Sequence, residues 1–337
     1  MRYSIIVPVY NRPDEVDELL ESLTLQTLKD FEVIIVEDGS VKPCKDVCDK
    51  YANILDLHYY AKENSGPGQS RNYGAERSKG EWLIILDSDV VLPEGYLQAV
   101  DNSVQGQAAW GGPDAAHPSF TPVQKAISYS MTSFFTTGGI RGGKAKLDKF
   151  YPRSFNMGIR RDVYLQLGGF TKMRFGEDID FSYRIVEAGY MPRLFPDAWV
   201  WHKRRTDFRK FFRQVYNSGI ARINLEKRHP GTMKLVHLLP TVFTLGVIGL
   251  LLITLFWPLA CVPIILYCFI ICLDSSIKNR SLWVGLLSIP AAFVQLMGYG
   301  FGFIESWWKR CILKQDEFSP CERSEVERTA FEKNFYK

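Results

Sequence analysis

The chain has 337 residues, of which 46% are hydrophobic and 23% are charged, and its formal net charge is +4. This composition excludes a disordered, collagen-like or heptad-repeat chain, and the small net charge gives no indication of nucleic-acid binding. The seven cysteines, an odd number, do not form the pattern of a disulfide framework and favour a reducing, cytosolic environment.

The first 90 residues alternate between strands and helices. Apolar runs too continuous for a one-faced strand predict buried parallel strands over 3–9, 31–36, 55–60 and 81–86. Helices are predicted between them, over about 13–26, 45–52 and 66–78. This alternation predicts an α/β fold with a doubly wound, mainly parallel sheet flanked by helices.

Polar residues follow these strands, at the edge where a doubly wound sheet binds its ligands. They are Asn11, the pair Glu37-Asp38 and the turn Asp87-Ser88-Asp89. Clustered carboxylates need a cation or hydrogen-bond donors to neutralise them. An Asp-x-Asp turn offers oxygen ligands to a hard divalent ion, so Mg²⁺ or Mn²⁺ bridging to a phosphate group is expected here. The alternative interpretation is a set of turn and helix-capping residues.

The next segment carries fewer signals. Residues 111–155 show little periodicity, and their paired glycines, Gly138-Gly139 and Gly142-Gly143, suggest a mobile lid. Glu177, Asp178 and Asp180 precede an apolar stretch that ends near Gly189. They are either first-turn acids favoured by a helix dipole or catalytic carboxylates. His202, after a further predicted strand, is either a surface residue or a metal ligand.

The C-terminal part is apolar. Residues 235–273 contain no Asp, Glu, Lys or Arg. This is about twice the roughly 20 residues that one crossing requires, and Trp257-Pro258 near its middle predicts two spans joined tightly. Residues 282–304 form a third apolar run, which either spans the membrane, lies in the interface or packs as a core helix. Three spans are expected.

The orientation follows from the charges beside the first span. Ten basic residues and two acidic ones lie between Lys203 and Lys234. By the positive-inside rule this places the polar body at the cytoplasmic face of the cell membrane, as part of a multi-pass protein. Three spans would put Lys309, Arg310 and Lys314 outside, whereas two would keep them inside.

Five motifs between residues 3 and 230 resemble, in order and spacing, those of the family 2 glycosyltransferases, which have the GT-A fold. They are SIIVPVYNRP, SLTLQTLKDFEVIIVEDGS, NSGPGQSRNYGAERSKGEWLIILDSD, NMGIRRDVYLQLGGF and FGEDIDFSYRIVEAGY. The resemblance implies an inverting transferase that moves a sugar from a nucleoside diphosphate to a hydroxyl group. It implies a nucleotide-sugar-binding half over 1–110 and an acceptor and catalytic half over 111–234. The apolar runs add a membrane region of two or three helices over 235–305 and leave a polar tail over 306–337.

The resemblance also implies roles for individual residues. It places Pro8, Tyr10 and Asn11 in the nucleotide pocket. Asp38 would accept a hydrogen bond from the base, expected to be uracil, and Arg71 would reach the base or the phosphates. Asp87 would face the ribose or the metal.

The remaining roles concern the metal and the catalytic step. Asp89 would ligate the metal, with His202 as a further ligand. The pair Glu177-Asp178 matches the acidic pair of the family, with Asp178 as the general base. An inverting displacement needs such residue types, because the hydroxyl must lose its proton to a carboxylate within about 3 Å. A divalent ion and a guanidinium can stabilise the departing diphosphate.

Two alternative functions remain open at this point. A processive polysaccharide synthase of the family would carry Gln-x-x-Arg-Trp, but here Gln214 is followed by Val215-Tyr216-Asn217-Ser218. A single-addition enzyme with a lipid-linked or surface-glycan acceptor is therefore favoured. A non-catalytic nucleotide-sugar-binding membrane protein would keep Asp38 and Asp89 but would not need Asp178.

Overall fold

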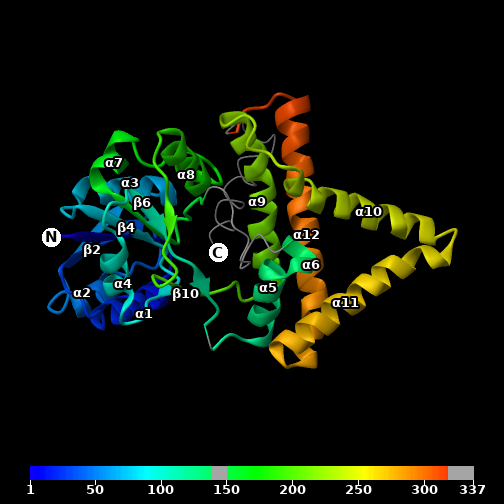
Figure 1. Ribbon diagram of the computed structural model, residues 1–337, viewed down its shortest axis with the longest axis horizontal. Coiled ribbons are helices and arrows are strands. Elements are labelled where there is room, and N and C mark those ends of the chain that lie inside the picture. The colour runs from blue at the N-terminus through cyan, green and yellow to red at the C-terminus, as the bar shows by residue number, and fades with distance from the viewer. Residues whose placement is uncertain (118, 139–149, 318–337) are drawn as a thin grey trace.

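The computed structural model describes residues 1–117, 119–138 and 150–317. Figure 1 shows an α/β body at the N-terminal end, two long helices beside it, and two further helices that form a wedge pointing away from the body. The body carries the predicted site, so its sheet is described first.

The N-terminal half of the sheet is parallel, as predicted. Its strands lie in the order β3-β2-β1-β4. Their bounds are β1 (Tyr3–Val9), β2 (Phe31–Asp38), β3 (Leu57–Lys62) and β4 (Trp82–Leu86). The helices between them are α1 (Pro13–Thr24), α2 (Lys45–Tyr51) and α3 (Pro67–Arg77). Glu37 and Asp38 are the last two residues of β2, not residues of the following turn, since β3 continues the ladder to this point.

The second half of the sheet is mixed. The strand β8 (Asn156–Arg160) runs antiparallel to β4 and to β6 (Ala109–Gly111), and β9 (Arg193–Leu194) closes the edge parallel to β6. A small second sheet contains β5 (Val90–Val91), β10 (Val200–His202) and β7 (Asp114–Ala115). The predicted mainly parallel α/β fold is confirmed, but β8 breaks the doubly wound pattern.

Residues 111–155 contain more helix than expected. They contain α5 (Pro122–Thr132) and α6 (Phe134–Thr137). The other helices of the body after β4 are α4 (Tyr96–Ser103), α7 (Arg161–Gln166), α8 (Glu177–Glu187) and α9 (Phe208–Arg228). The start of α5 has a capping box, in which Thr121 and Gln124 each bond the other's backbone N–H. Of the predicted lid glycines, Gly139, Gly142 and Gly143 lie outside the described residues.

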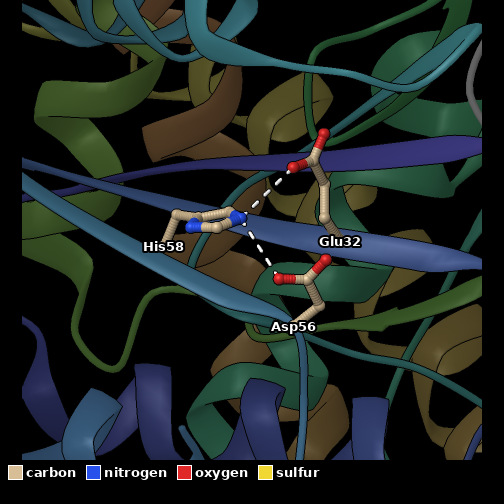
Figure 2. Close-up of side chains that lie close together, drawn as sticks. All are labelled: Glu32, Asp56 and His58. Atoms are coloured by element: carbon tan, nitrogen blue, oxygen red, sulfur yellow. Dashed lines mark ion pairs between the residues drawn. The ribbon is translucent and has the colours of Figure 1, made fainter. Parts of the chain in front are cut away.

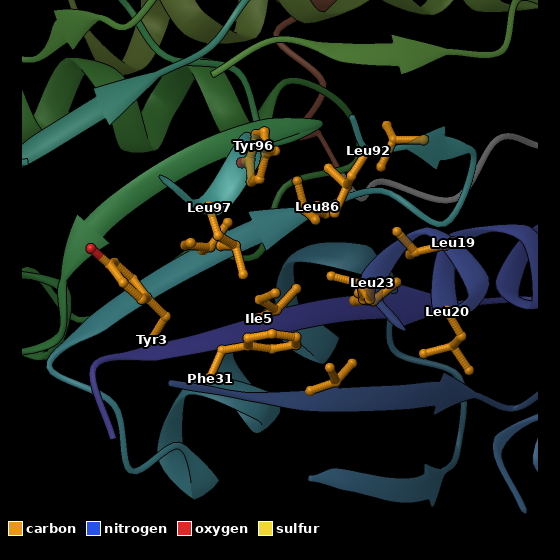
Figure 3. Close-up of a cluster of buried hydrophobic side chains, with 14 of the residues drawn as sticks. Tyr3, Ile5, Leu19, Leu20, Leu23, Phe31, Leu86, Leu92, Tyr96 and Leu97 are labelled. Carbon is orange, nitrogen blue, oxygen red and sulfur yellow. The ribbon is translucent and has the colours of Figure 1, made fainter. Parts of the chain in front are cut away.

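Both faces of the sheet are buried. Side chains of α1, α2 and α4 pack on one face, around Ile5, Leu20 and Leu97 (Figure 3). Side chains of α3, α7 and α8 pack on the other face, around Ile6 and Phe181. Each such fully buried side chain stabilises the fold by about 1.5–3 kcal/mol, which fixes the strand ends where the polar residues lie.

The C-terminal helices are long and apolar. They comprise η1 (Leu235–His237), α10 (Leu239–Thr254), η2 (Pro258–Cys261), α11 (Val262–Asn279), α12 (Leu282–Trp307) and η3 (Trp308–Ile312). Three segments, Leu235–Thr254, Pro258–Asn279 and Leu282–Ile312, are each long and apolar enough to cross a membrane. The predicted break at Trp257-Pro258 is present, between α10 and η2.

Candidate active site

The carboxyl ends of β1, β2 and β4 meet at one edge of the sheet, and a cavity of about 810 Å³ opens there. Its lining includes eight of the ten residues that the sequence singled out, namely Pro8, Tyr10, Asp38, Arg71, Asp87, Asp89, Glu177 and Asp178. The other two, Asn11 and His202, contact the loops beside it. Side chains as far apart in sequence as Pro8 and Asp178 therefore share one cavity.

Asn11 holds the loop that follows β2. Its backbone is left-handed, with a φ of 55°. Its side-chain carbonyl accepts hydrogen bonds from the backbone N–H groups of Val41 (2.8 Å) and Lys42 (2.9 Å). Its own backbone N–H donates to Ser40 Oγ (2.7 Å). In this arrangement Asn11 shapes the rim of the cavity through the neighbouring loop.

Asp38 is buried, and its carboxylate is neutralised locally. It accepts hydrogen bonds from the backbone N–H groups of Ser65 and Gly66, each at 2.9 Å, and pairs with the ammonium of Lys62. One oxygen accepts from Gly66 alone among the described residues. Because a carboxylate oxygen has two acceptor positions, Asp38 can still accept a hydrogen bond from a ligand in the cavity.

Arg71 joins two of the acids. Its guanidinium donates to Asp87 Oδ1 (2.8 Å) and to Glu177 Oε1 (3.0 Å) and lies over the ring of Phe170. Its side chain is only 4% exposed, so the guanidinium itself is held away from water. Burial raises the pKa of Glu177; Arg71 opposes this, and the charge of Asp178 adds to it.

Asp87, Asp89 and His202 form a compact group, with potential ligand atoms within 4.8 Å of one another. Asp89 Oδ1 lies 3.2 Å from His202 Nε2. Burial lowers the pKa of His202, but Asp89 and Asp114 outweigh it, and the pKa is raised to about 9. Burial raises the pKa of Asp89, but His202, Arg205 and Arg12 outweigh this and hold it well below its usual range.

This group fits a divalent cation. Asp89 Oδ1 is buried and accepts no hydrogen bond from the described residues. Two carboxylates and an imidazole are a donor set that suits Mn²⁺, and the carboxylates alone suit Mg²⁺. A cation on His202 would displace the ring proton, so its binding would release a proton.

Asp178 is the second residue of α8, which begins at Glu177 after Gly176. Its Oδ2 accepts from Arg153 Nε (2.6 Å), and its Oδ1 accepts from the backbone N–H of Ile179 (2.9 Å). Burial alone would raise the pKa of Asp178, but the charge and hydrogen bond of Arg153 outweigh it, and the pKa is lowered. Asp178 is therefore ionised at neutral pH, which is the form that can accept a proton.

Sequence reasoning missed the cations that neutralise these acids. Lys62 pairs with Asp38, 24 positions away, and Arg153 with Asp178, 25 positions away. Arg12 and Arg205 lie 3.9 and 3.8 Å from Asp89. Only Lys62 carried a signal, because it lies just after the strand predicted over 55–60, as Asp38 lies just after the strand predicted over 31–36.

The cavity extends beyond the sheet edge to the C-terminal helices. This second part is lined by α9, α10 and α12, including His237, Leu239, Gln295 and Tyr299. Its charged lining residues from position 205 onward are all basic; they are Arg205, Lys210, Arg213 and Arg222. The acidic residues of the cavity thus gather at the sheet edge, where Arg12, Arg71 and Arg153 neutralise them, whereas the charged residues of the helical part are all basic.

A second cluster of ionisable side chains lies where β2 and β3 begin, at the ends of the strands opposite the cavity. Figure 2 shows His58 Nε2 between Glu32 (3.4 Å) and Asp56 (3.2 Å). The other oxygen of Glu32 accepts from Ser4 Oγ and from the backbone N–H of Lys79, both at 2.6 Å. The carboxylate therefore ties β1, β2 and β3 to the end of α3, and these contacts give it a structural role.

Residues 4–168 match the sequence model of glycosyl transferase family 2. An uncharacterized glycosyltransferase of Haemophilus influenzae is 32% identical over 197 residues, which are 55% of this chain and 62% of the relative. A pre-mycofactocin glycosyltransferase of Mycobacterium tuberculosis is 26% identical over 249 residues, which are 67% of this chain and 48% of the relative. The chain thus spans less than two thirds of the length of these curated relatives.

The fold is shared with a solved structure. A mannosyltransferase of Pyrobaculum calidifontis, in complex with GDP-Man and Mn²⁺, has a TM-score of 0.59 and 19% identity, and the match covers 88% of this chain and 87% of the other. The matched residues 4–168 contain β1 to β4 and β8, which carry or adjoin most of the site. Residues 4–168 therefore form a glycosyl transferase family 2 domain, and the chain has the GT-A fold.

Proposed function

We propose that the protein is an inverting glycosyltransferase that moves a sugar from a nucleoside-diphosphate sugar to a hydroxyl group of a lipid-linked acceptor. The observation that carries this proposal is the single cavity that joins Asp38, the Asp87–Asp89 turn and the Glu177-Asp178 pair to the apolar helices. A nucleotide, a diphosphate and an acceptor each find a suitable set of groups along it.

Asp178 serves as the general base. It is ionised at neutral pH and lines the cavity, so it can take the proton of an attacking hydroxyl. The hydroxyl oxygen forms a bond to the anomeric carbon while the bond to the diphosphate breaks on the opposite face, which inverts the configuration. Glu177 instead holds Arg71, which positions the guanidinium.

The leaving group is stabilised at the other acids. Asp89, Asp87 and His202 would hold a divalent cation, which would supply positive charge to the departing diphosphate. Arg71 adds a buried guanidinium, whose planar donors suit phosphate oxygens. Asp38 accepts a hydrogen bond from the base, and we propose a UDP-sugar as the donor.

The acceptor approaches from the membrane side. Lys210 and Arg213 line the part of the cavity next to α10 and α12. Their positive charges favour an anionic head group, such as the phosphate of a lipid-linked substrate. Together with the basic residues between Lys203 and Lys234, this supports a position at the cytoplasmic face of the cell membrane.

The base assignment is tested by replacing Asp178 with Asn and measuring nucleotide release and donor binding separately. We expect turnover to fall by about 10²–10⁴-fold, while stabilisation of the protein by the nucleotide sugar and Mn²⁺ is retained. The matched control is Glu177→Gln, which should weaken donor binding through Arg71. Normal turnover of the Asp178→Asn variant would overturn the assignment, and no turnover by the wild type with any donor would favour a non-catalytic binding protein.

A further inference from the structure

The arrangement of α12 relative to the α10–α11 wedge bears on how the protein sits on a membrane. Along the longest axis of the molecule, Figure 1 shows first the α/β body, then the pair α9 and α12, and then the wedge. The wedge points away from the body, whereas α12 runs across that direction. The wedge and α12 therefore cannot both stand upright in one bilayer.

The helix α12 packs against α5 and α9 along its whole length. Near its N-terminal end, Val284 and Ala291 pack with Ala126 of α5. Near its C-terminal end a Cβ at Gly302 would overlap the backbone of Tyr216 in α9, and a Cβ at Gly219 in α9 would overlap that of Tyr299. If α12 crossed the bilayer, α5 and α9 would have to enter the hydrocarbon with it.

Placing α12 and its partner helices across the bilayer would cost free energy, because α9 is charged. The flanking helix α9 carries Arg213, Arg222 and Glu226 within its length, besides further basic residues in its first and last turns. Each charged side chain at the centre of a bilayer costs at least about 2.5–3.5 kcal/mol. Lying flat at the membrane surface removes this cost, because the charges of α9 then stay in the headgroup and water layers.

The outer face of α12 suits such a surface position. At spacings of three or four residues, which share one helical face, its exposed or half-exposed residues are all apolar. They are Leu282, Leu286, Pro290, Phe293, Met297, Phe301 and Ile304, followed by Trp308 of η3. The wedge covers the middle of this face, where Phe293 packs against Phe243 of α10 and Tyr267 of α11. A helix with one apolar face and a partnered opposite face is typical of an interfacial helix.

The wedge of α10 and α11 has the length and the exposed apolar surface expected of a segment inserted into the bilayer. Only 11% and 17% of the apolar windows of its two segments are buried, against 39% for the segment that contains α12. Its tip is apolar and open, with Phe256 90% and Trp257 60% exposed. The 16 residues of α10 span about 24 Å, which is close to the roughly 30 Å of the hydrocarbon core.

The chain beyond α12 returns to the body. Arg310 Nε donates to Asn224 Oδ1 of α9 (2.9 Å). Glu317 pairs with Arg228 (3.2 Å) and accepts from the backbone N–H of Arg174 (2.7 Å). Residues 310–317 therefore lie on the same side of any membrane as the catalytic residues.

We propose that the α10–α11 wedge is the only described part that enters the bilayer core, and that α12 lies in the membrane surface. The partner of these apolar faces is the lipid bilayer. The expected third crossing is replaced by an in-plane helix, which closes the base of the wedge beside the basic end of the cavity. This arrangement delivers the head group of a membrane lipid to the site, and the placement itself does not depend on the proposed chemistry.

The test uses nitroxide labels on the full-length protein in vesicles of phosphatidylcholine and phosphatidylglycerol. Leu286→Cys and Phe301→Cys lie 15 residues apart on the outer face of α12, or about 22 Å. An in-plane helix predicts equal, shallow depths for the two labels, measured by accessibility to oxygen and to a water-soluble nickel complex. Depths that differ by about 22 Å, in opposite leaflets, would overturn the proposal, as would a label at Phe256→Cys that is no deeper than the other two.

A second measurement fixes the side of the C-terminal end. Lys314→Cys, in a protein with Cys311 and Cys321 replaced by Ser, is labelled with a membrane-impermeant maleimide in intact cells and in inverted vesicles. Glu63→Cys, on the body, is the matched reference. We expect both sites to be labelled in the same preparation; labelling of the two sites from opposite sides would contradict the proposal. Nucleotide binding by each variant shows that it is folded.

Discussion

Replacing Arg71 with Met tests whether the buried guanidinium holds the acids of the site together. The Arg71 side chain is 4% exposed, and its partner Glu177 is 16% exposed. The substitution leaves Glu177 buried without its cation, which costs about 3 kcal/mol. Asp87 is 33% exposed, so water screens it and it adds little. In a domain of this size the loss corresponds to a fall in Tm of about 6–12 °C.

The assay is thermal unfolding of the purified protein in detergent, with and without the nucleotide. The matched control is the double variant Arg71→Met with Glu177→Gln, which removes the unpaired charge and should recover about half of the lost Tm. Neither variant should be stabilised by the nucleotide diphosphate as much as the wild type. An unchanged Tm for Arg71→Met, or a further fall in the double variant, would refute the role of this ion pair.

Three further predictions follow from the site and its surroundings. Asp89→Asn should weaken the Mn²⁺-dependent stabilisation by nucleotide at least about tenfold in Mn²⁺ concentration; titration after chelation checks this, and an unchanged midpoint would exclude Asp89 as a ligand. The double variant Lys210→Gln, Arg213→Gln should raise the KM for an anionic lipid acceptor about tenfold, whereas Arg209→Gln, outside the cavity lining, should not; equal effects would contradict an acceptor site there. Burial raises the pKa of Asp180, but hydrogen bonds from Thr171 and His229 and the charge of Arg184 outweigh it and lower the pKa. The ionised Asp180 therefore stabilises the fold above the ordinary pKa of 3.8, and this stabilisation is lost as the pH falls below that value. Asp180→Asn should lower Tm most near pH 7 and least below about pH 4, and a difference in Tm that is the same at every pH would refute this.

The fold of the N-terminal half was predictable because its signals are local. The apolar run Tyr3–Val9 and the apolar face of the helix from Pro13 onward are each read from neighbouring residues. The acids at the ends of β2 and β4 were found by the same reasoning, since the ends of parallel strands share an edge. These positions needed no knowledge of distant contacts.

The neutralising cations were not predictable in the same way. The pairing of Arg153 with Asp178 and of Arg71 with Glu177 joins residues 25 and 106 positions apart. The antiparallel insertion of β8 beside β4 is likewise a tertiary event, because no local pattern states which strand a given strand will join. A single sequence carries no signal for such contacts.

The membrane helices show a different limit. Hydropathy identified the third apolar run, yet it cannot distinguish a crossing helix from one that lies in the interface. The distinguishing facts are the contacts of α12 with α5 and α9 and the return of Arg310 to Asn224. The proposed in-plane position of α12 therefore rests on tertiary packing, whereas composition alone predicts a third span.

The central claim is that carboxylates from separate loops converge to hold a cation at the carboxyl edge of the sheet. Anomalous X-ray scattering from crystals grown with UDP and Mn²⁺ measures the position of that cation directly. We predict a manganese peak among Asp87, Asp89 and His202, in contact with the diphosphate. A nucleotide bound without manganese there, or a peak only at Glu32, Asp56 and His58, would contradict the claim.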